Sequence, residues 1–258
     1  MRLAIRHTTR YDFGLPVARG LQRLRLKPKT SHGQQILDWQ MHLEGARLEA
    51  EYDDQHHNRT VLISVEPGAS AVTIICSGLV ETSGNAGMVG PHTGFMPLWH
   101  FRAQTALTQP GPLMRALVAR LKDRNDSLEM LHALSRGVLD AVDYEIGFTD
   151  AETTAEQAMA AGRGVCQDHA HIFIGCARAL GITASYVSGY LMMNDRIDQE
   201  AGHGWAEAHV DGLGWVAFDV SNGISADSRY VRVATGCDYR EAAPVTGISY
   251  GAGETALA

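Results

Sequence analysis

The spacing of the apolar residues changes its period twice along the chain, and this change limits the folds that the sequence can adopt. Before residue 83 the period is two, most clearly at residues 37–43, where apolar and polar side chains alternate as in a half-buried strand. Between residues 113 and 180 the spacing becomes helical, and after residue 182 the period of two returns. Strands, helices and strands in this order predict an α+β fold.

Three regions follow from this pattern. Residues 1–82 contain about six short strands separated by turn-forming residues, which predicts an antiparallel β-sandwich as an N-terminal domain. Residues 83–111 are rich in Gly and Pro and predict a linker that packs partly on a neighbour. Residues 112–258 predict a second domain of helices followed by an antiparallel sheet. With 258 residues, the chain is long enough for both domains to bury a core.

Composition and charge exclude several classes of protein. The chain has 45% hydrophobic and 20% charged residues, as in a folded globular protein. Its net charge of -7 has the wrong sign for general binding of nucleic acid or of an anionic membrane surface. No apolar run approaches the roughly 18 residues of a membrane span, and the N-terminus lacks the apolar stretch of a secretory signal. Four cysteines are too few for a disulfide framework, so we expect reduced thiols and a cytoplasmic location.

Two helices in the middle of the chain have clear start and stop signals. Thr153 with Glu156 three residues later forms a capping pattern, and Gly162 is expected to stop the helix that it opens. The next helix is predicted to start near Cys166 and to end before Gly181. A glycine-bearing loop therefore delivers the Cys166 thiol to the first turn of a helix.

This position of Cys166 favours nucleophilic chemistry. The unpaired N–H groups and the macrodipole at a helix N-terminus stabilise an anion, and so favour the thiolate form of a cysteine. The same N–H groups can bind the oxyanion that forms when a sulfur attacks a carbonyl. A base and a group that orients it would complete such a site.

A predicted hairpin at residues 203–219 supplies both groups. Its turn signal lies at residues 211–214, between two strands with a period of two. If the strands pair across a three-residue loop, Asp219 lies opposite Trp205 and diagonal to His203, about 7 Å away at the backbone. A carboxylate there can orient the imidazole of His203 and stabilise its protonated form.

Four blocks of the sequence resemble the bacterial type of the transglutaminase-like superfamily, which has an N-terminal β domain. They are GRGVCQDHAH at 162–171, ASYVSGYL at 184–191, HGWAE at 203–207 and GWVAFDV at 214–220. The segments RLAIRHTTRY and LRLKP near the N-terminus resemble the opening of that family, so the likeness covers nearly the whole chain. The resemblance implies a papain-like core with Cys166 as nucleophile, His203 as base and Asp219 as the group that orients the base.

The resemblance implies acyl transfer from an amide through an acyl-enzyme, on peptide or glutaminyl-type substrates. We expect hydrolysis, as in a cysteine protease or amidase, in preference to transfer to an amine. The family also contains members without catalysis, so a peptide-binding module of the same fold is the alternative. The expected partner is a peptide or protein substrate.

Five residues near these three are also candidates for a role in the site. His169 stands where the family usually has an aromatic residue, and with Trp205 it is a candidate for substrate binding, although Trp205 is also typical of a hairpin core. Gly164 and Asp168 flank the cysteine and are expected to have structural roles. Glu207 is expected to be a structural hydrogen-bond acceptor.

A zinc site formed by Cys166, His169 and His203 is a third interpretation, because these residue types are zinc ligands. Positions 166 and 169 lie about 60° apart round a helix, so these two side chains can converge. The sequence contains neither an Asp-rich calcium loop nor a glycine-rich phosphate loop, and we expect no metal and no required cofactor.

The remaining cysteines and two histidines have simpler interpretations. Cys76 and Cys176 are expected in the core, because free cysteine behaves as a small hydrophobic residue. Cys237 is expected to be an exposed loop thiol. His56 and His57, beside two aspartates, are expected in a solvated turn.

Overall fold

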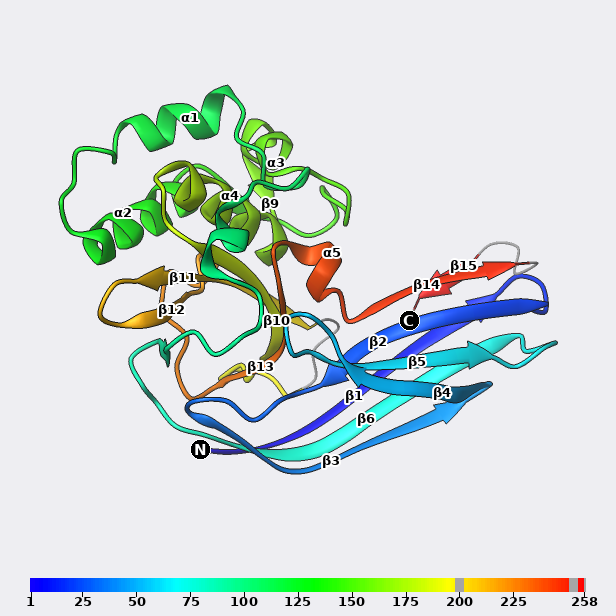
Figure 1. Cartoon of the computed structure of the whole chain (residues 1–258). Helices are drawn as coiled ribbons and strands as arrows, with labels where there is room; N and C mark the ends of the chain where they lie inside the picture. The colour runs from blue at the N-terminus through cyan, green and yellow to red at the C-terminus, as the bar shows by residue number, and fades with distance from the viewer. Residues whose placement is uncertain (198–201, 251–254, 258) are drawn as a thin grey trace.

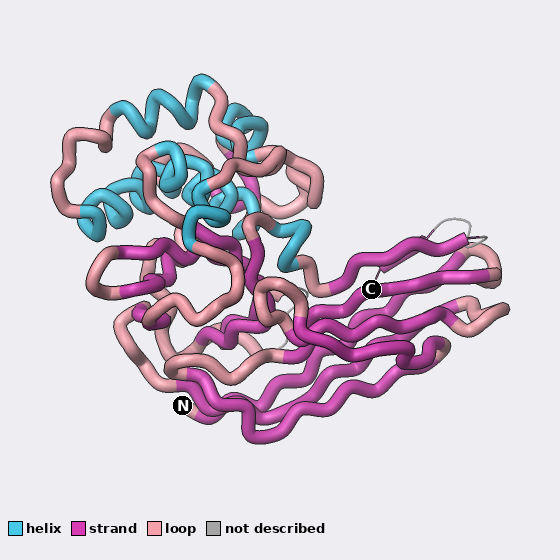
Figure 2. The backbone as a smooth tube through the Cα atoms, in the orientation of Figure 1, coloured by secondary structure: helices cyan, strands magenta, loops and turns pink. Residues whose placement is uncertain are grey.

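The computed structural model describes residues 1–197, 202–250 and 255–257. Figure 1 shows a long β-sandwich beside a second body in which helices cover a sheet, and Figure 2 shows that most of the helical turns lie on the side of this body away from the sandwich. Helices and antiparallel sheets occupy separate parts of the chain, as predicted for an α+β fold. None of the helices within the described ranges is long and apolar enough to cross a membrane.

Two four-stranded antiparallel sheets form the sandwich. Their orders are β15-β1-β6-β3 and β14-β2-β5-β4. The six N-terminal strands are β1 (Arg2–Phe13), β2 (Arg19–Lys27), β3 (Gln34–Glu44), β4 (Ala46–Asp53), β5 (Arg59–Val65) and β6 (Ala71–Thr82). Inward-facing side chains such as Leu24, Ile63 and Val72 are fully buried between the sheets. The alternation in the sequence thus reflects one buried face per sheet.

The last strands of the chain return to the sandwich. β14 (Val245–Tyr250) pairs with β2, and β15 (Thr255–Leu257) pairs with β1. The sequence had grouped all residues after 111 with the helices, whereas the sheet topology places these two strands with the N-terminal region. A period of two shows that a segment is extended, but it does not show which sheet the segment joins.

A five-stranded antiparallel sheet forms the centre of the second body, in the order β13-β10-β11-β12-β7. Its strands are β7 (Met88–Gly90), β10 (Ala184–Leu191), β11 (His203–Val210), β12 (Gly214–Phe218) and β13 (Tyr230–Gly236). β7 and the short 3-10 helix η1 (Leu98–Arg102) lie in the segment expected to be a linker. That segment therefore contributes an edge strand to the sheet as well as a connection.

Helices pack on one face of this sheet. They are α1 (Pro112–Ala119), α2 (Ser127–Leu139), α3 (Ala155–Ala161) and α4 (Cys166–Ala179), while the one-turn helix α5 (Tyr239–Ala242) follows β13. A short parallel pair, β8 (Asp143–Tyr144) and β9 (Arg163–Gly164), precedes α4. From Asp168 to Arg178 every residue of α4 is buried, so this helix runs through the core of the body.

The cap of α3 lies one residue later than predicted. Thr154, not Thr153, accepts from the N–H of Gln157, and the side chain of Gln157 bonds back to the N–H of Thr154. Glu156 faces α1 instead, where its carboxylate accepts from the N–H groups of Gly111, Leu113 and Met114 at the start of that helix. A carboxylate favours this place because the N–H groups of a first turn have no partner within the helix.

Two side-chain amides of the sandwich join it to β13, which is the edge strand of the core sheet. Gln34 donates to the carbonyl oxygen of Arg232 and accepts from the N–H of the same residue, both at 2.8 Å. Asn58 makes the same pair of bonds with Thr235, at 2.7 and 2.8 Å. These amides satisfy an edge strand that would otherwise leave its backbone groups unpaired.

Candidate active site

The start of α4 presents the Cys166 thiol at a partly exposed position. Asp168 fixes this turn, because its Oδ2 accepts from the N–H of Val165 at 2.8 Å and from the hydroxyl of Thr149 at 2.7 Å. Gly164 allows the close packing, since a Cβ at that position would lie 2.7 Å from Oδ2 of Asp168. The two residues expected to have structural roles beside the cysteine thus hold the loop that carries it.

The hairpin brings His203 to Asp219. Val210 pairs with Gly214 and the register continues to Ala206 opposite Phe218, as predicted from the turn. Nε2 of His203 lies 2.6 Å from Oδ2 of Asp219. A carboxylate oxygen only accepts, so Nε2 donates and Nδ1 is the nitrogen left to hydrogen-bond Cys166.

Asp219 is fully buried and has four hydrogen-bond donors. Oδ2 accepts from His203, from the hydroxyl of Tyr230 at 2.6 Å and from Nδ2 of Asn222 at 2.7 Å, and Oδ1 accepts from the backbone N–H of Asn222 at 3.2 Å. Burial alone would raise the pKa of this carboxyl, but the hydrogen bond and charge of His203 outweigh it and lower the pKa. The group is therefore an anion at neutral pH.

The two neighbours of His203 decide its charge. Burial alone would lower the pKa of the imidazole, but the hydrogen bonds and negative charges of Asp219 and Cys166 raise the pKa to about 10. The site therefore favours an imidazolium between the carboxylate of Asp219 and the sulfur of Cys166. Such an arrangement supports attack by sulfur on a carbonyl, followed by proton transfer from the imidazolium to a leaving amine.

Trp205 is buried in the core. It is 2% exposed, and its ring stacks on His203 with centroids 6.1 Å apart and meets Tyr230 edge to face at 5.4 Å. The sequence left two interpretations of Trp205 open, substrate binding and packing in the hairpin core. Substrate binding requires an accessible face of the ring, and the buried position of Trp205 favours the core. Its contacts instead restrict the ring of His203.

His169 is also inaccessible, being fully buried. Nε2 lies 2.9 Å from the carbonyl oxygen of Val142 and so donates to it, and Nδ1 lies 2.8 Å from Oγ of Ser221 and so accepts. Burial lowers the pKa of this imidazole, which keeps it neutral. Both nitrogens already have partners, so the arrangement fits neither a substrate contact nor the zinc site with Cys166 and His203.

Glu207 lies on the same face of β11 as His203 but binds a different partner. Its carboxylate is almost fully buried and forms two hydrogen bonds with Arg232, to Nε at 2.5 Å and to Nη2 at 2.8 Å. It is thus a hydrogen-bond acceptor, in the role expected from the sequence. The pair connects β11 to β13.

The sequence did not identify several residues around the site. Tyr230 comes from β13, and no local sequence signal connects this strand with the hairpin. Asn222 lies in the turn directly after Asp219, and aspartate side chains often accept hydrogen bonds from the backbone of such a turn. Three further tyrosines lie near Cys166. Burial raises their pKa values, and a negative charge on Cys166 raises them further; they are Tyr144, Tyr186 and Tyr239.

The other thiols are unlike Cys166. Cys76, Cys176 and Cys237 are buried, and burial raises the pKa of each to about 12. The expectation of an exposed loop thiol at Cys237 is wrong, because the residue packs against Phe101 and Trp215. His56 is likewise buried rather than solvated, because its turn packs against the core body.

Comparison with known proteins agrees with this geometry. Residues 115–220, which include Cys166, His203 and Asp219, match the transglutaminase-like superfamily, and residues 3–81 match the bacterial transglutaminase-like N-terminal region. The chain therefore carries a transglutaminase-like core preceded by a bacterial transglutaminase-like N-terminal region. The resemblance noted in its four sequence blocks is thereby confirmed, and the N-terminal match spans the six N-terminal strands of the sandwich.

Relatives of this transglutaminase-like chain share its whole length. It is 26% identical to "Uncharacterized protein ML0607" of Mycobacterium leprae, over 99% of this chain and 96% of that protein. It is also 26% identical to "Uncharacterized protein Mb2599c" of Mycobacterium bovis, over 96% and 88%. A crystal structure described as a "Putative Cysteine Protease from Cytophaga hutchinsonii" superposes with a TM-score of 0.77 at 19% identity, over 100% of this chain and 90% of that one. That likeness shows the shared fold.

Proposed function

We propose that this transglutaminase-like protein is a thiol hydrolase that cleaves an amide bond of a peptide or glutaminyl-type substrate. The observation that carries the proposal is the position of His203, which hydrogen-bonds Asp219 through Nε2 and Cys166 on its other side. The match to the transglutaminase-like superfamily supports a thiol enzyme. The name of the structural relative from Cytophaga hutchinsonii is consistent with protease chemistry.

In the proposed reaction, the sulfur of Cys166 attacks the amide carbonyl and the N–H groups of the first turn of α4 stabilise the oxyanion. The imidazolium of His203 donates its Nδ1 proton to the leaving amine, which departs as the acyl-enzyme forms. Nδ1 then accepts a proton from a water molecule as the oxygen of that water attacks the thioester carbonyl, and the C–S bond breaks to release the acid and regenerate the sulfur of Cys166 beside the protonated His203. Asp219 holds the ring and stabilises its charged form throughout.

The first test is the rate of iodoacetamide alkylation at each cysteine as a function of pH, with peptide mass spectrometry as the readout. We expect fast reaction of Cys166 at neutral pH and slow reaction of the three buried thiols. His203→Ala should remove the advantage of Cys166. If Cys166 reacts no faster than Cys237 in the native protein, the proposal fails.

Hydrolysis and transfer to an amine are separated by trapping the acyl-enzyme. A peptide library rich in glutamine and with varied backbone sites is incubated in ¹⁸O-labelled water, with and without a fluorescent primary amine. A larger amount of ¹⁸O-labelled acid than of amine-labelled product supports hydrolysis. A larger amount of amine-labelled product makes the protein a transferase. Cys166→Ala is the control that should abolish both products.

The alternative is a peptide-binding module of the same fold without turnover. It predicts that Cys166→Ala leaves peptide binding unchanged and that the native protein forms no product with any peptide that it binds. The intact set of Cys166, His203 and Asp219 favours the enzyme. The proposal also places the protein in the cytoplasm, where its four unpaired thiols would stay reduced.

A further inference from the structure

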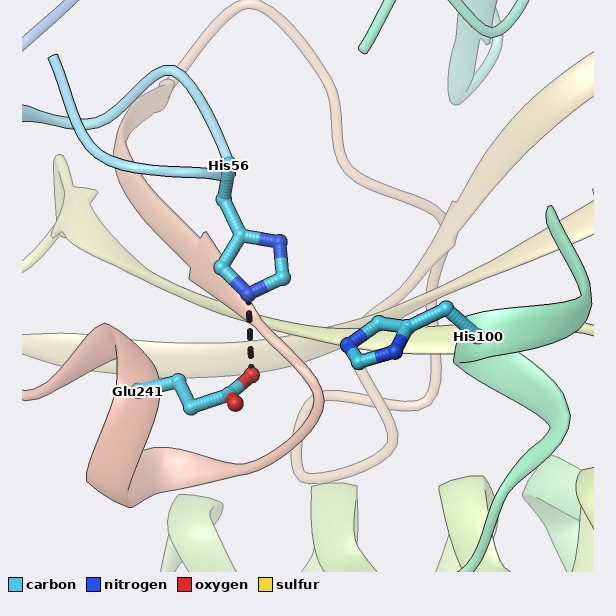
Figure 3. A group of neighbouring side chains, drawn as sticks. All are labelled: His56, His100 and Glu241. Carbon is cyan, nitrogen blue, oxygen red and sulfur yellow. Dashed lines mark hydrogen bonds and ion pairs between the residues drawn. The ribbon is translucent and has the colours of Figure 1, made fainter. Parts of the chain in front are cut away.

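A second group of potential metal ligands lies outside the candidate active site. It consists of His56, His100 and Glu241, each of which offers a ligand atom within 4.8 Å of those of the other two. Figure 3 shows the three side chains converging from the turn between β4 and β5, from η1 and from α5. Within residues 1–197, 202–250 and 255–257, no other three His, Cys, Asp or Glu side chains meet this spacing.

The hydrogen bonding of this group is incomplete. Nε2 of His56 donates to Oε2 of Glu241 at 2.9 Å, and the side chain of His56 is only 1% exposed. Nδ1 of His56 and Nε2 of His100 are buried without a partner. Figure 3 shows a ring nitrogen of His100 directed toward the other two residues. Buried ring nitrogens without partners are unfavourable, and a bound cation is one arrangement that would use such a nitrogen.

We propose that His56, His100 and Glu241 bind a zinc ion. Two imidazoles and one carboxylate are a common set of protein ligands for zinc, with water in the fourth position. Ligand atoms of a tetrahedral zinc lie about 3.3 Å apart, given bonds of about 2.0–2.1 Å. Nε2 of His56 lies 2.9 Å from Oε2 of Glu241, and His100 offers a ring nitrogen within 4.8 Å of both partners, so binding requires these atoms to adjust to the separation set by the metal. Zinc binds the lone pair of Nε2 of His56 in the tautomer that carries its proton on Nδ1, so the ring proton moves from Nε2 to Nδ1 and the hydrogen bond to Glu241 is replaced by the metal.

Two of the three ligands are held in place by neighbouring groups. The N–H of Cys237 donates to Oε2 of Glu241 at 2.7 Å. The backbone of His56 is fixed by Asp54, which accepts from its N–H at 2.9 Å, and by Lys29, which donates to its carbonyl oxygen at 2.8 Å. Such outer contacts orient ligands before the metal arrives.

A zinc ion at this position would stabilise the contact between the sandwich and the second body, with its water-bound position left open. Its ligands come from the sandwich, from the segment between the two domains and from the helix after β13, so the ion would link three parts of the chain that are far apart in sequence. This role does not depend on the proposed hydrolase activity.

Zinc binding to the full-length protein, first stripped with a chelator, tests the proposal by isothermal titration and by elemental analysis after dialysis. We expect one equivalent of zinc and a higher melting temperature with zinc than with chelator. His100→Ala should weaken zinc affinity by at least about 100-fold, because even changes to groups that contact the ligands weaken it 10–100-fold. Glu241→Gln, which keeps the shape of the side chain, should have the same direction of effect.

Two controls make the result specific. His42→Ala removes an exposed histidine of the sandwich and should leave zinc binding unchanged. Cys166→Ser should also leave it unchanged, which distinguishes this site from zinc bound at Cys166. Each variant is checked by circular dichroism in chelator. Absence of zinc binding by the native protein, or native affinity in both His100→Ala and Glu241→Gln, would overturn the proposal.

Discussion

The hydroxyl of Tyr230 donates a 2.6 Å hydrogen bond to Oδ2 of Asp219, the same oxygen that accepts from Nε2 of His203. Tyr230 lies on β13 and its ring also packs on Trp205, which in turn stacks on His203. The orientation of His203 thus depends on a strand outside the hairpin that carries it. This arrangement makes Tyr230 a positioning residue for the site.

Tyr230→Phe should lower the free energy of unfolding by about 1.5–3 kcal/mol, the usual contribution of a hydrogen bond to a charged group. The carboxylate of Asp219 is fully buried, so solvent does not replace the lost donor. Urea unfolding of the variant and the native protein measures the difference. Equal midpoints and slopes would show that this hydrogen bond adds nothing to stability.

Asp219→Asn should slow Cys166 alkylation at neutral pH by about 100-fold or more, because the charge that stabilises the imidazolium is lost. Three donors point at the position of Oδ2, so the amide oxygen should occupy it and His203 should keep its present tautomer. Alkylation rates with mass spectrometry report the change. A rate within a factor of two of the native protein would contradict the role given to this charge.

His203 should stay protonated at pH 8, since its neighbours raise its pKa to about 10. Its pKa lies above the unfolded value of about 6.5, so the stability that it adds is complete below pH 6.5 and disappears as the pH rises through 10. Histidine NMR titration reads the pKa, and urea unfolding at several pH values reads the stability. Asp219→Asn should move the titration to lower pH; an unchanged titration would contradict this account.

Gly164→Ala should destabilise the protein by about 1–3 kcal/mol and slow alkylation of Cys166, because its Cβ would displace Asp168 from the loop before α4. Gly84→Ala is the matched control, since a Cβ there meets nothing within 4 Å. Thermal unfolding and alkylation rates are measured for both. Equal effects of the two substitutions would show that the packing of Asp168 against Gly164 is not required.

Asn58→Ala should lower the free energy of unfolding by about 1–3 kcal/mol, because it leaves the N–H and carbonyl groups of Thr235 without partners at a buried position. Gln34→Ala should act in the same way at Arg232. Gln35→Ala removes an exposed amide from the same strand as Gln34 and serves as the control. If Gln35→Ala loses as much stability as the other two variants, the hydrogen bonds of Gln34 and Asn58 to β13 are not the cause of the loss.

The parts of the site that could be predicted are those set by short-range geometry. The hairpin register follows from a turn of known length, so the approach of Asp219 to His203 was accessible from the sequence. The burial of Trp205 was not, because it depends on Tyr230 and on the packing of β13. For the same reason His56 and Cys237 were assigned to solvent, although contacts with distant segments bury both.

Local sequence patterns are sufficient to predict the α+β order of elements, the helix that starts at Cys166 and the hairpin that carries His203 and Asp219. Period, caps and turns act over a few residues, and these local preferences survive in the folded chain. Three further relationships become visible in the folded chain alone: β14 and β15 join the sandwich, His169 is buried, and His56, His100 and Glu241 meet. These relationships arise from packing between segments distant in sequence, which no local pattern specifies.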